Sequence, residues 1–385
     1  MEYKTIPQHS DRMQIILKAG CVSRLLLLMV LPDVVQAQNA YSTNADGSIY
    51  TYSTNTDGTV NIVAYAGPPW VVTIPAAINN LPVTSIGVNA FFQSSVTSMT
   101  IPDSVTTLGN SAFEECYSLT SVTMSNSVTY IGNSAFWHCT SLTNITIPNS
   151  VTNIDQYAFD GCSSLTNVSI PNSVTNIGMN AFYDCSSLTN VTIGNGVTNI
   201  GEEVFGVCSS LTSVTIGKGV TSIGLLAFYD CLSLTNVTIP NNVTSIDQNA
   251  FEGCVSLEGV YFQGNAPTVY LPMFTEDRHV TTYYLPAASG WSNTFWRPTP
   301  PAVLWNPQAN NDASFGVQSN QFGFNITGNS NLVVVVESCT NLANPIWSPV
   351  STNTLNTFIG TNGISYFSDP LWTNYPCRFY GFSWP

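Results

Sequence analysis

The chain has 385 residues, of which 44% are hydrophobic and only 8% charged, and its formal net charge is −14. So high an apolar content excludes a charge-driven disordered chain, and no run reaches the ~18 to 20 apolar residues of a membrane-spanning helix. Because an acidic surface repels phosphate backbones and anionic headgroups, the composition argues against nucleic-acid and membrane-surface partners.

The first 37 residues have the features of a secretory signal peptide. Lys18 and Arg24 precede the apolar run LLLLMVL, and small residues follow around Ala37. A basic flank, a short apolar run and a small-residue end are the three parts of such a peptide. We therefore expect residues 1–37 to be removed, which leaves a mature chain that is secreted or at the cell surface and has no membrane-inserted segment. A buried helix is the alternative.

Residues 38–69 contain two runs in which apolar and polar side chains alternate. Asp57-Gly58, a frequent turn pair, separates the runs. Alternation on both sides of such a pair is typical of a β-hairpin. A hairpin is therefore predicted here.

A 23-residue repeat follows, over residues 70–262. Each unit has a phenylalanine, a cysteine three residues later and a leucine three further on. The full series is Phe113, Phe136, Phe159, Phe182, Phe205, Phe228 and Phe251; Cys116, Cys139, Cys162, Cys185, Cys208, Cys231 and Cys254; and Leu119, Leu142, Leu165, Leu188, Leu211, Leu234 and Leu257. A V-T-I segment with strand periodicity comes next, and Pro or Gly closes it. One such strand cannot bury its apolar side alone, so the units must stack as parallel strands about 4.8 Å apart.

The unit I-G-x-x-A-F-x-x-C-x-S-L-T-x-V-T-I-P resembles the BspA-type bacterial leucine-rich repeat over residues 70–262. The resemblance implies a right-handed solenoid in a secreted or surface protein with a binding or adhesion role and no common ligand. On the same grounds, residues 38–69 look like the N-terminal β-hairpin cap of such arrays. Residues 263–296 look like their C-terminal cap.

The chain after residue 296 differs from the array in composition. Residues 297–312 are rich in Pro and Asn and are predicted to be a linker. Four or five short strands, separated by Asn, Gly, Pro and Ser, predict a small all-β, sandwich-like module over residues 313–385. Residues 341–385, with NLANPIWSPV and YFSDPLWTNYPCRFY, resemble a terminal module of some secreted bacterial repeat proteins, for which a structural or attaching role is expected. The predicted fold class is therefore mainly β, a repeat solenoid followed by a small β domain.

The cysteines fall into two groups. The seven of the repeat are expected to be buried thiols that act as small hydrophobic side chains, because inward side chains aimed alike have poor geometry for disulfides. Cys339 and Cys377 lie on separate predicted strands of the terminal module. A disulfide between these two and a pair of free thiols both remain open.

No arrangement typical of catalysis or metal binding appears in the sequence. His138 and His279 are the histidines after residue 37, and neither has a companion at metal-ligand spacing. The sequence has no G-x-S-x-G motif, and its adjacent acid pairs do not suggest two carboxylates across a cleft. We therefore predict a protein that is not an enzyme and has no metal or cofactor. Enzyme activity in the C-terminal module is a remaining alternative.

Two surfaces of the array are candidates for recognising a partner. The first is formed by the two variable positions after each phenylalanine, where side chains are expected to point outward. Aromatic side chains supply much of interface energy, so we define an aromatic patch of Trp137, Tyr183, Asp184, Tyr229 and Asp230. Sequence drift at unselected positions explains the same variation.

The second candidate is a polar row on the outward side of the strands. We define a polar ladder that consists of Thr146, Thr192, Thr215, Thr238, Asn144, Asn190 and Asn236. β-Propensity, solubility and hydrogen bonding between coils explain these residues without a ligand. A regular hydroxyl lattice also suits a polysaccharide or ice. The sequence thus predicts a secreted or cell-surface binding or adhesion protein that recognises a protein or glycan. A passive structural, ice-binding or polysaccharide-binding solenoid is the alternative.

Overall fold

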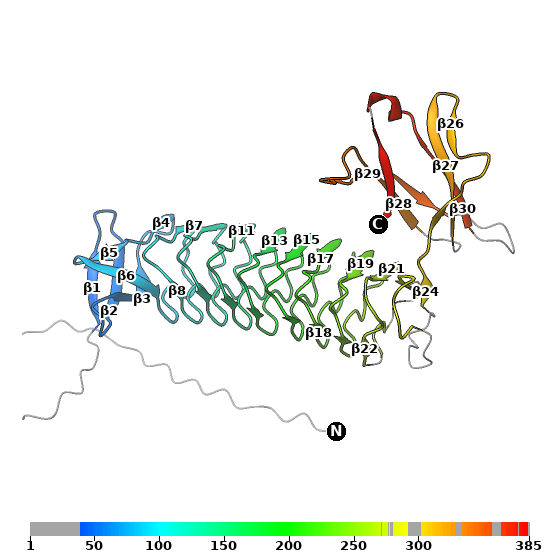
Figure 1. Cartoon of the computed structure of the whole chain (residues 1–385). Helices are drawn as coiled ribbons and strands as arrows, with labels where there is room; N and C mark the ends of the chain where they lie inside the picture. Colours follow the sequence, from blue (N-terminus) through cyan, green and yellow to red (C-terminus); the bar gives the residue numbers. More distant parts are fainter. Residues whose placement is uncertain are drawn as a thin grey trace, which may run out of the picture. The chain divides into compact units, whose positions relative to one another are not determined.

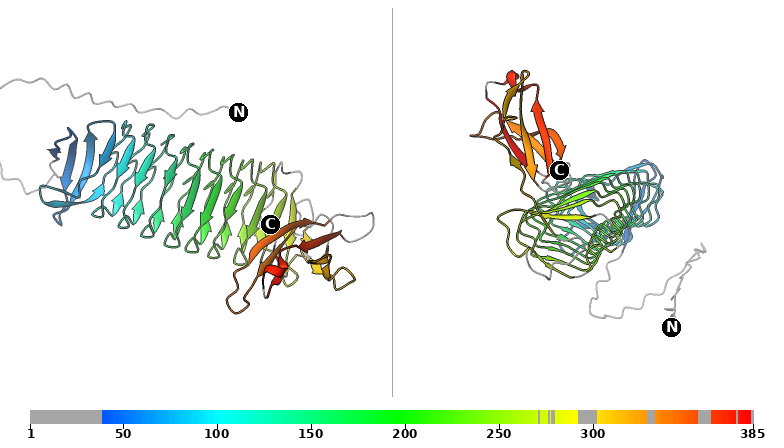
Figure 2. Two further views of the ribbon diagram at one scale, coloured as in Figure 1. Left: turned by 90° about the horizontal axis from the view of Figure 1, so that it is seen from above. Right: turned by 90° about the vertical axis from the view of Figure 1, so that its right-hand side faces the viewer.

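The fold is mainly β, as predicted (Figures 1 and 2). The structure is a computed structural model that describes residues 39–270, 272–275, 277, 280–291, 302–328, 333–355, 363–375 and 377–383. The predicted signal peptide, residues 1–37, lies outside these residues. Within them, η1 (Trp372–Asn374) is the one helical segment, a single 3-10 turn.

An antiparallel three-stranded meander begins the described chain. It consists of β1 (Ala40–Thr43), β2 (Ile49–Thr54) and β3 (Val60–Ala66). In the β2–β3 turn, Asp57 accepts hydrogen bonds from the backbone N–H and the hydroxyl of Thr59, and Gly58 takes a φ of 82°. β3 then pairs in parallel with β6 (Leu81–Ile86), on which β5 (Ala77–Ile78) folds back. The predicted hairpin therefore exists, and it joins the first coil directly.

Two rows of short parallel strands run along the array (Figure 1). The first row contains β4 (Val71–Thr73), β7 (Ser98–Thr100), β9 (Ser121–Thr123), β11 (Asn144–Ile145), β13 (Asn167–Ile170), β15 (Asn190–Ile193), β17 (Ser213–Thr215), β19 (Asn236–Ile239), β21 (Gly259–Phe262), β23 (Thr281–Tyr284) and β24 (Val303–Leu304). The second row follows β6 with β8 (Thr107–Leu108), β10 (Tyr130–Ile131), β12 (Asn153–Ile154), β14 (Asn176–Ile177), β16 (Asn199–Ile200), β18 (Ser222–Ile223), β20 (Ser245–Ile246) and β22 (Thr268–Val269). Val168 pairs with Val191 and Ile154 with Ile177, so the 23-residue register is confirmed.

The repeated side chains fill one continuous interior. The phenylalanine, cysteine and leucine of each of the seven units are at most 1% exposed. Neighbouring phenylalanine rings stack at centroid distances of 5.1 to 5.6 Å from Phe113 to Phe251. Stacked aromatic pairs add to the stabilisation that burial alone provides. Each coil is therefore stabilised by contact with the coil before it and the coil after it.

Coil-type strands continue beyond residue 262, the predicted end of the repeats. β22 pairs with β20, and β23 pairs with β21 in the same parallel sense. β24 pairs with β23, and β25 (Gln308–Ala309) pairs with β27 of the C-terminal module. Both strands fall in the segment 297–312 that composition predicts to be a linker. The described part of that segment is therefore more ordered than predicted, because two-residue strands are too short to show an alternating pattern.

The C-terminal module consists of two antiparallel sheets, which confirms the all-β prediction. The strands after β25 are β26 (Gly316–Gln318), β27 (Gln321–Gly328), β28 (Val333–Cys339), β29 (Ser348–Thr354), β30 (Gly363–Asp369) and β31 (Phe379–Ser383). β27 pairs with β25, β26 and β30, while β28 lies between β29 and β31. Phe324, Ile326, Val334, Val336 and Phe367 are buried together in its core.

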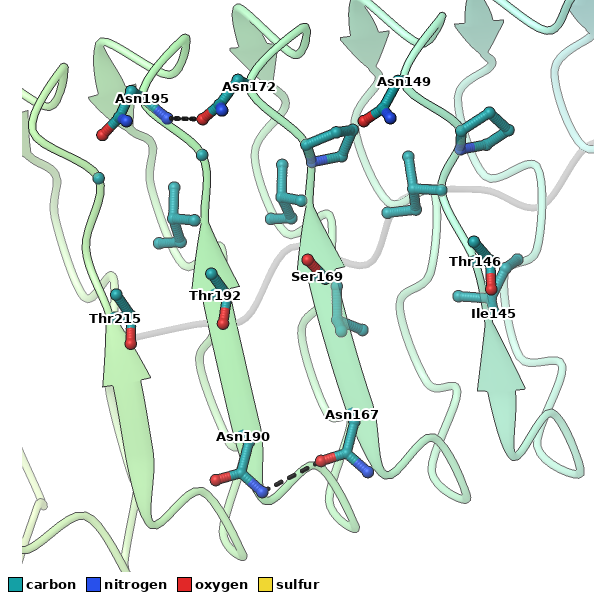
Figure 3. Close-up of a pocket in the computed structure, with 18 of the residues that line it drawn as sticks. Ile145, Thr146, Asn149, Asn167, Ser169, Asn172, Asn190, Thr192, Asn195 and Thr215 are labelled. Carbon is teal, nitrogen blue, oxygen red and sulfur yellow. Dashed lines mark hydrogen bonds between the residues drawn. The ribbon is translucent and has the colours of Figure 1, made fainter. Parts of the chain in front are cut away.

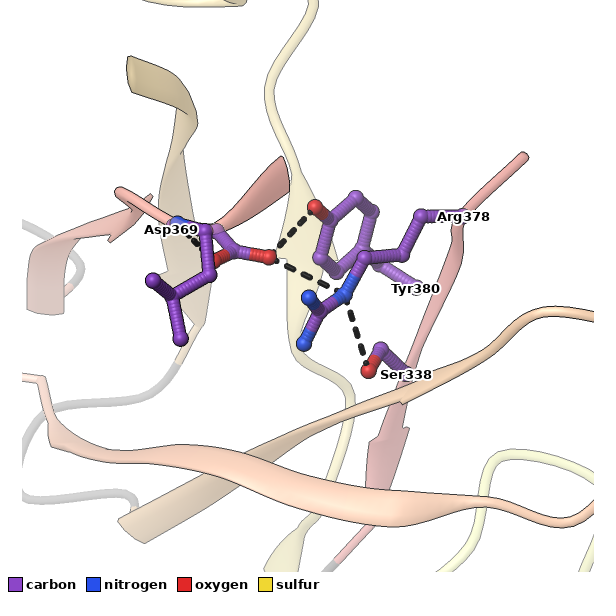
Figure 4. Close-up of polar contacts among 5 residues, drawn as sticks. Ser338, Asp369, Arg378 and Tyr380 are labelled. Carbon is purple, nitrogen blue, oxygen red and sulfur yellow. Dashed lines mark hydrogen bonds and ion pairs between the residues drawn. The ribbon is translucent and has the colours of Figure 1, made fainter. Parts of the chain in front are cut away.

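A buried polar cluster ties three strands of the module together (Figure 4). The Asp369 side chain is 1% exposed, and its Oδ2 lies 3.0 Å from Arg378 Nε and 2.8 Å from the Tyr380 hydroxyl that donates to it. Arg378 Nε also donates to Ser338 Oγ, and the Leu371 N–H donates to Asp369 Oδ1. Burial, with the nearby carboxylate, raises the pKa of Tyr380 well above its ordinary value. The cluster thus links β28, β30 and β31.

Candidate binding surface

The outward side of the first strand row holds a pocket of about 900 Å³ that extends across four coils (Figure 3). Strands β11, β13, β15 and β17 supply its floor, and the turns that follow them supply one rim. Along each strand the side chains alternate, so Val191 and Ile193 are buried while Asn190 and Thr192 face outward. Strand periodicity therefore presents one hydroxyl per coil, and also one amide on each of β11, β13 and β15. We call this pocket the groove.

The structure brings the whole polar ladder onto this face. Thr146, Thr192, Thr215, Asn144 and Asn190 line the groove. Thr238 and Asn236 line an adjoining pocket of about 520 Å³, which Thr215 also borders. The sequence ladder is thus a single surface.

The threonines of the array differ in what their hydroxyls do. The threonines just before the first-row strands donate their hydroxyls to a backbone carbonyl of the preceding coil, as Thr212 does to Thr189 O at 3.1 Å. The threonines before the second-row strands do the same, as from Thr175 to Thr152 O at 3.2 Å. The groove row is different. Within the described part of the chain, no hydroxyl of that row has a hydrogen-bond partner, and its members are Thr146, Ser169, Thr192 and Thr215.

Some asparagines of the groove are held in place by their neighbours. Asn190 Nδ2 donates to Asn167 Oδ1 at 3.0 Å and to Thr189 Oγ1 at 3.0 Å. At the rim, the oxygen of Asn172 accepts the N–H of Asn195 at 2.7 Å (Figure 3). Side chains that are already oriented lose little conformational entropy when they bind a ligand. The amides of Asn167, Asn172 and Asn190 are therefore preorganised.

Charge is nearly absent from the groove. Lys218 is the single charged residue among those that line it, although the chain as a whole carries −14. The acids of the same coils lie elsewhere, as Asp160, Asp184 and Asp230 do after their phenylalanines. Such a surface offers no counter-charge to a strongly ionic ligand.

The aromatic patch is less exposed than predicted. All five of its residues are half-buried. Trp137 donates from Nε1 to Asp160 Oδ2 at 3.0 Å, and the Tyr183 ring covers Gly206 so closely that a Cβ there would lie 2.9 Å from it. Packing between coils therefore constrains these variable positions, contrary to the expectation that it imposes nothing. Burial raises the pKa of Asp160 to about 6, against the opposing effect of the Trp137 hydrogen bond.

Backbone conformation explains part of that variation. The second residue after each phenylalanine takes a left-handed φ, which is 50° at Asp184, 54° at Asp230 and 70° at Gly161. Glycine, Asn and Asp adopt this conformation most readily. The glycines at 161 and 253 were the sequence signal for this turn.

The cysteine ladder has a polar role that the sequence did not reveal. Each buried thiol donates to the backbone carbonyl of the phenylalanine in the preceding coil, with Sγ–O distances of 3.0 to 3.3 Å. All seven thiols are free and buried, as predicted. Burial raises the pKa of the Cys185 thiol well above its ordinary value. The side chains are therefore both small hydrophobic groups and hydrogen-bond donors.

Cys339 and Cys377 are also free in the structure, the first buried and the second exposed. The structure gives the considered disulfide no support, and that pairing stays a prediction. Of the two histidines, His138 is half-buried beside Trp137, and His279 lies outside the described residues. No group of three or more potential metal ligands gathers anywhere in the described part of the chain.

Among the residues that the structure describes, no helix is both long enough and apolar enough to cross a membrane.

The stacked parallel coils and their ladders define a leucine-rich repeat solenoid. A family model described as BspA type leucine rich repeat region matches residues 84–212 and 175–290, in six copies, and so spans more than half of the chain. The protein belongs to this family. No curated protein matches the chain.

Several solved structures are similar to the chain. A leucine-rich repeat protein from T. pallidum is 29% identical with a TM-score of 0.46, over 54% of this chain and 87% of that one. One from Bacteroides ovatus is 25% identical with a TM-score of 0.46, over 66% and 71%. A leucine-rich cell surface protein from Faecalibacterium prausnitzii is 25% identical with a TM-score of 0.26, over 58% and 88%.

Proposed function

We propose that this protein is a secreted or cell-surface binding protein that recognises a glycan or protein through the groove. The observation that carries this proposal is the difference between the threonine rows. Two rows use their hydroxyls to join coils, whereas the groove row uses none of its hydroxyls on a described residue. Stability therefore accounts for the first two rows and leaves the third available to a ligand.

The groove is favoured over the aromatic patch for a structural reason. Trp137 and Tyr183 are already engaged with the neighbouring coil, and each would have to give up packing to meet a partner. Asn190 and Asn172 in the groove are already oriented by hydrogen bonds to neighbouring coils, so binding there costs less reorganisation.

Placement outside the cell rests on the sequence before residue 38. Its basic, apolar and small-residue stretches have the order of a signal peptide. Fractionation of cells that express the full chain tests this part of the proposal, and retention of an unprocessed chain in the cytoplasm contradicts it.

Two matched variants test the binding surface. The groove variant combines Ser169→Ala, Thr192→Val and Thr215→Val, which remove three hydroxyls and leave the strands intact. The patch variant combines Tyr183→Ala and Tyr229→Ala. We expect the full chain to bind at least one ligand on a glycan array or a panel of immobilised extracellular glycoproteins. The groove variant should bind it about tenfold more weakly, at the usual strength of a few neutral hydrogen bonds.

The opposite pattern would overturn the assignment. If the patch variant loses binding and the groove variant keeps it, the partner surface is the aromatic patch. If the full chain binds nothing on either panel, the proposed binding function is wrong and the protein is a passive or an ice-binding solenoid. Thermal hysteresis measurements distinguish a passive solenoid from an ice-binding one.

A further inference from the structure

On the basis of the proposed function, we infer that the ligand of the groove is an uncharged, β-linked polysaccharide that lies along the axis of the array. The groove row supplies one free hydroxyl per coil, and the coils are in register, with Ser169 paired to Thr192 and Thr192 to Thr215. Neighbouring strands lie about 4.8 Å apart, so these hydroxyls recur at that interval. A ligand that lies along the axis stays in step with the coils only if each of its units advances by a distance close to this interval.

An extended β-1,4-linked glycan has a suitable spacing. Its sugar rings advance along the chain by a distance close to the strand spacing, so one ring lies over each coil between Thr146 and Thr215. Successive rings are turned over relative to each other, so equivalent sugar hydroxyls recur at every second coil. α-1,4-Linked glucans coil instead of extending, so they lose this match.

An extended peptide fits the groove poorly in either direction. Along the axis, a peptide in strand conformation rises about 3.4 Å per residue and repeats its side-chain direction at every second residue, so it falls out of step with the coils. Parallel to the strands it has no free edge to join, because β15 already has β13 on one side and β17 on the other. A peptide therefore cannot use strand addition here.

The chemistry of the lining agrees with an uncharged hydroxylated ligand. Three successive coils present an amide and a hydroxyl, as Asn190 and Thr192 do, and Pro148 and Pro171 form an apolar part of the rim. No aromatic ring is among the residues that line the groove, so stacking on a sugar contributes nothing. Affinity must then accumulate from weak hydrogen bonds repeated over successive coils, which makes it depend on ligand length.

Titration calorimetry of the full chain with β-linked gluco- and xylo-oligosaccharides tests the inference. We expect affinity to rise by about tenfold from disaccharide to tetrasaccharide, as two further coils each add a weak contact. It should then level off when the ligand spans the groove. α-Linked gluco-oligosaccharides of the same lengths should bind at least about tenfold more weakly. Because the groove is nearly uncharged, added salt should leave the affinity unchanged.

Two variants separate a groove effect from a folding effect. Ser169→Ala, Thr192→Val and Thr215→Val together should abolish the dependence on length. Thr175→Val, which removes a hydroxyl of a coil-joining row, should leave oligosaccharide affinity as it is in the unsubstituted chain.

Each remaining outcome overturns a different statement. Equal binding of the α- and β-linked series, or affinity that does not change with length, contradicts the register argument. If no oligosaccharide binds but a protein ligand is lost on substitution of the groove, the glycan inference falls and the proposed function stands. If the groove variant binds every ligand as well as the unsubstituted chain does, both fall.

Discussion

The repeat array and the C-terminal module are both built from β-strands, yet they obtain their stability differently. In the array, every coil repeats the same contacts with its neighbours, a phenylalanine on a phenylalanine and a thiol on a carbonyl. In the module, strands distant in sequence meet, and one buried ion pair, Arg378 with Asp369, joins them. The array thus spreads its stability over many equal interfaces, whereas the module concentrates part of it in one place.

The comparison also separates structure from recognition. Most repeated side chains of the array are either packed in the interior or hydrogen-bonded to a neighbouring coil. Two of the three hydroxyl rows belong to the second group. A surface is available for a ligand only where a copied polar group has no structural task. The hydroxyls of the groove row have no such task, although most of the residues that carry them are threonines, as in the two rows that join coils.

Substitution in the phenylalanine column should have the largest effect. Phe182→Ala should lower the free energy of unfolding by about 3 to 5 kcal/mol, because it opens a cavity in a packed column. Tyr183→Ala, the adjacent residue, should lower it by less than about 1 kcal/mol, since that side chain is only half-buried. Denaturant melts of both variants measure the difference, and equal losses would mean that the inner and outer faces are misassigned.

In the module, Arg378→Met should lower stability by about 3 kcal/mol, because it leaves the buried Asp369 carboxylate without its charge partner. Hydrogen exchange followed by mass spectrometry should show faster exchange in β28, β30 and β31 with no change in the array. Loss of protection along the array as well would show that the two regions are not independent in stability.

Two substitutions of one array cysteine test whether its thiol hydrogen bond contributes to stability. Cys185→Ala should destabilise by about 2 kcal/mol, because it removes buried volume and the hydrogen bond to Phe159 O. Cys185→Ser should cost about 1 kcal/mol, since its hydroxyl can still donate to that carbonyl. Thermal melts compare the two. If Ser is worse than Ala, the thiol acts as a hydrophobic group alone.

The smallest effect concerns pH and the aromatic patch. Burial raises the pKa of Asp160 from 3.8 to about 6, so the folded protein binds a proton more tightly than the unfolded chain. The contribution of Asp160 to stability should therefore be greatest below pH 3.8 and be lost as the pH rises through about 6. After allowance for solvent screening, the ionised carboxylate costs about 1 kcal/mol at neutral pH.

Asp160→Asn should remove that cost, since the amide oxygen still accepts from Trp137. We expect the variant to be more stable than the unsubstituted chain at neutral pH and no different from it in acid. Glu202→Gln, on an exposed side chain, is the matched control. A variant that is less stable at neutral pH would show that the ionised carboxylate is favourable.

The fold of the array was predictable from the sequence because the same pattern of buried residues recurs in every repeat. The step from Phe159 to Phe182 gives the register, and the alternation in NVTI gives the inward face. In the module, strand existence was predictable, but the pairing of β28 with β31 was not, since no local pattern encodes contact between distant segments. The buried cluster around Asp369 left no signal at all.

The candidate site was only half predictable. The polar ladder could be placed on one face, but Thr175 and Thr192 are the same residue type in similar V-T contexts. Their hydroxyls differ because of the backbone that each one meets in the neighbouring coil, which the sequence does not state. The half-burial of Tyr183 was missed for a similar reason, because it depends on a glycine in the following coil.

The stacking of the coils into one closed interior is tested most directly by native-state alkylation with residue-by-residue mass spectrometry. The structure predicts that Cys377, which is exposed, reacts at once, and that the seven array thiols react only after denaturation, because they are buried. If Cys185 or any other array cysteine is labelled as fast as Cys377 in the native protein, the copied side chains do not form an interior, and the assignment of the outer faces fails with it.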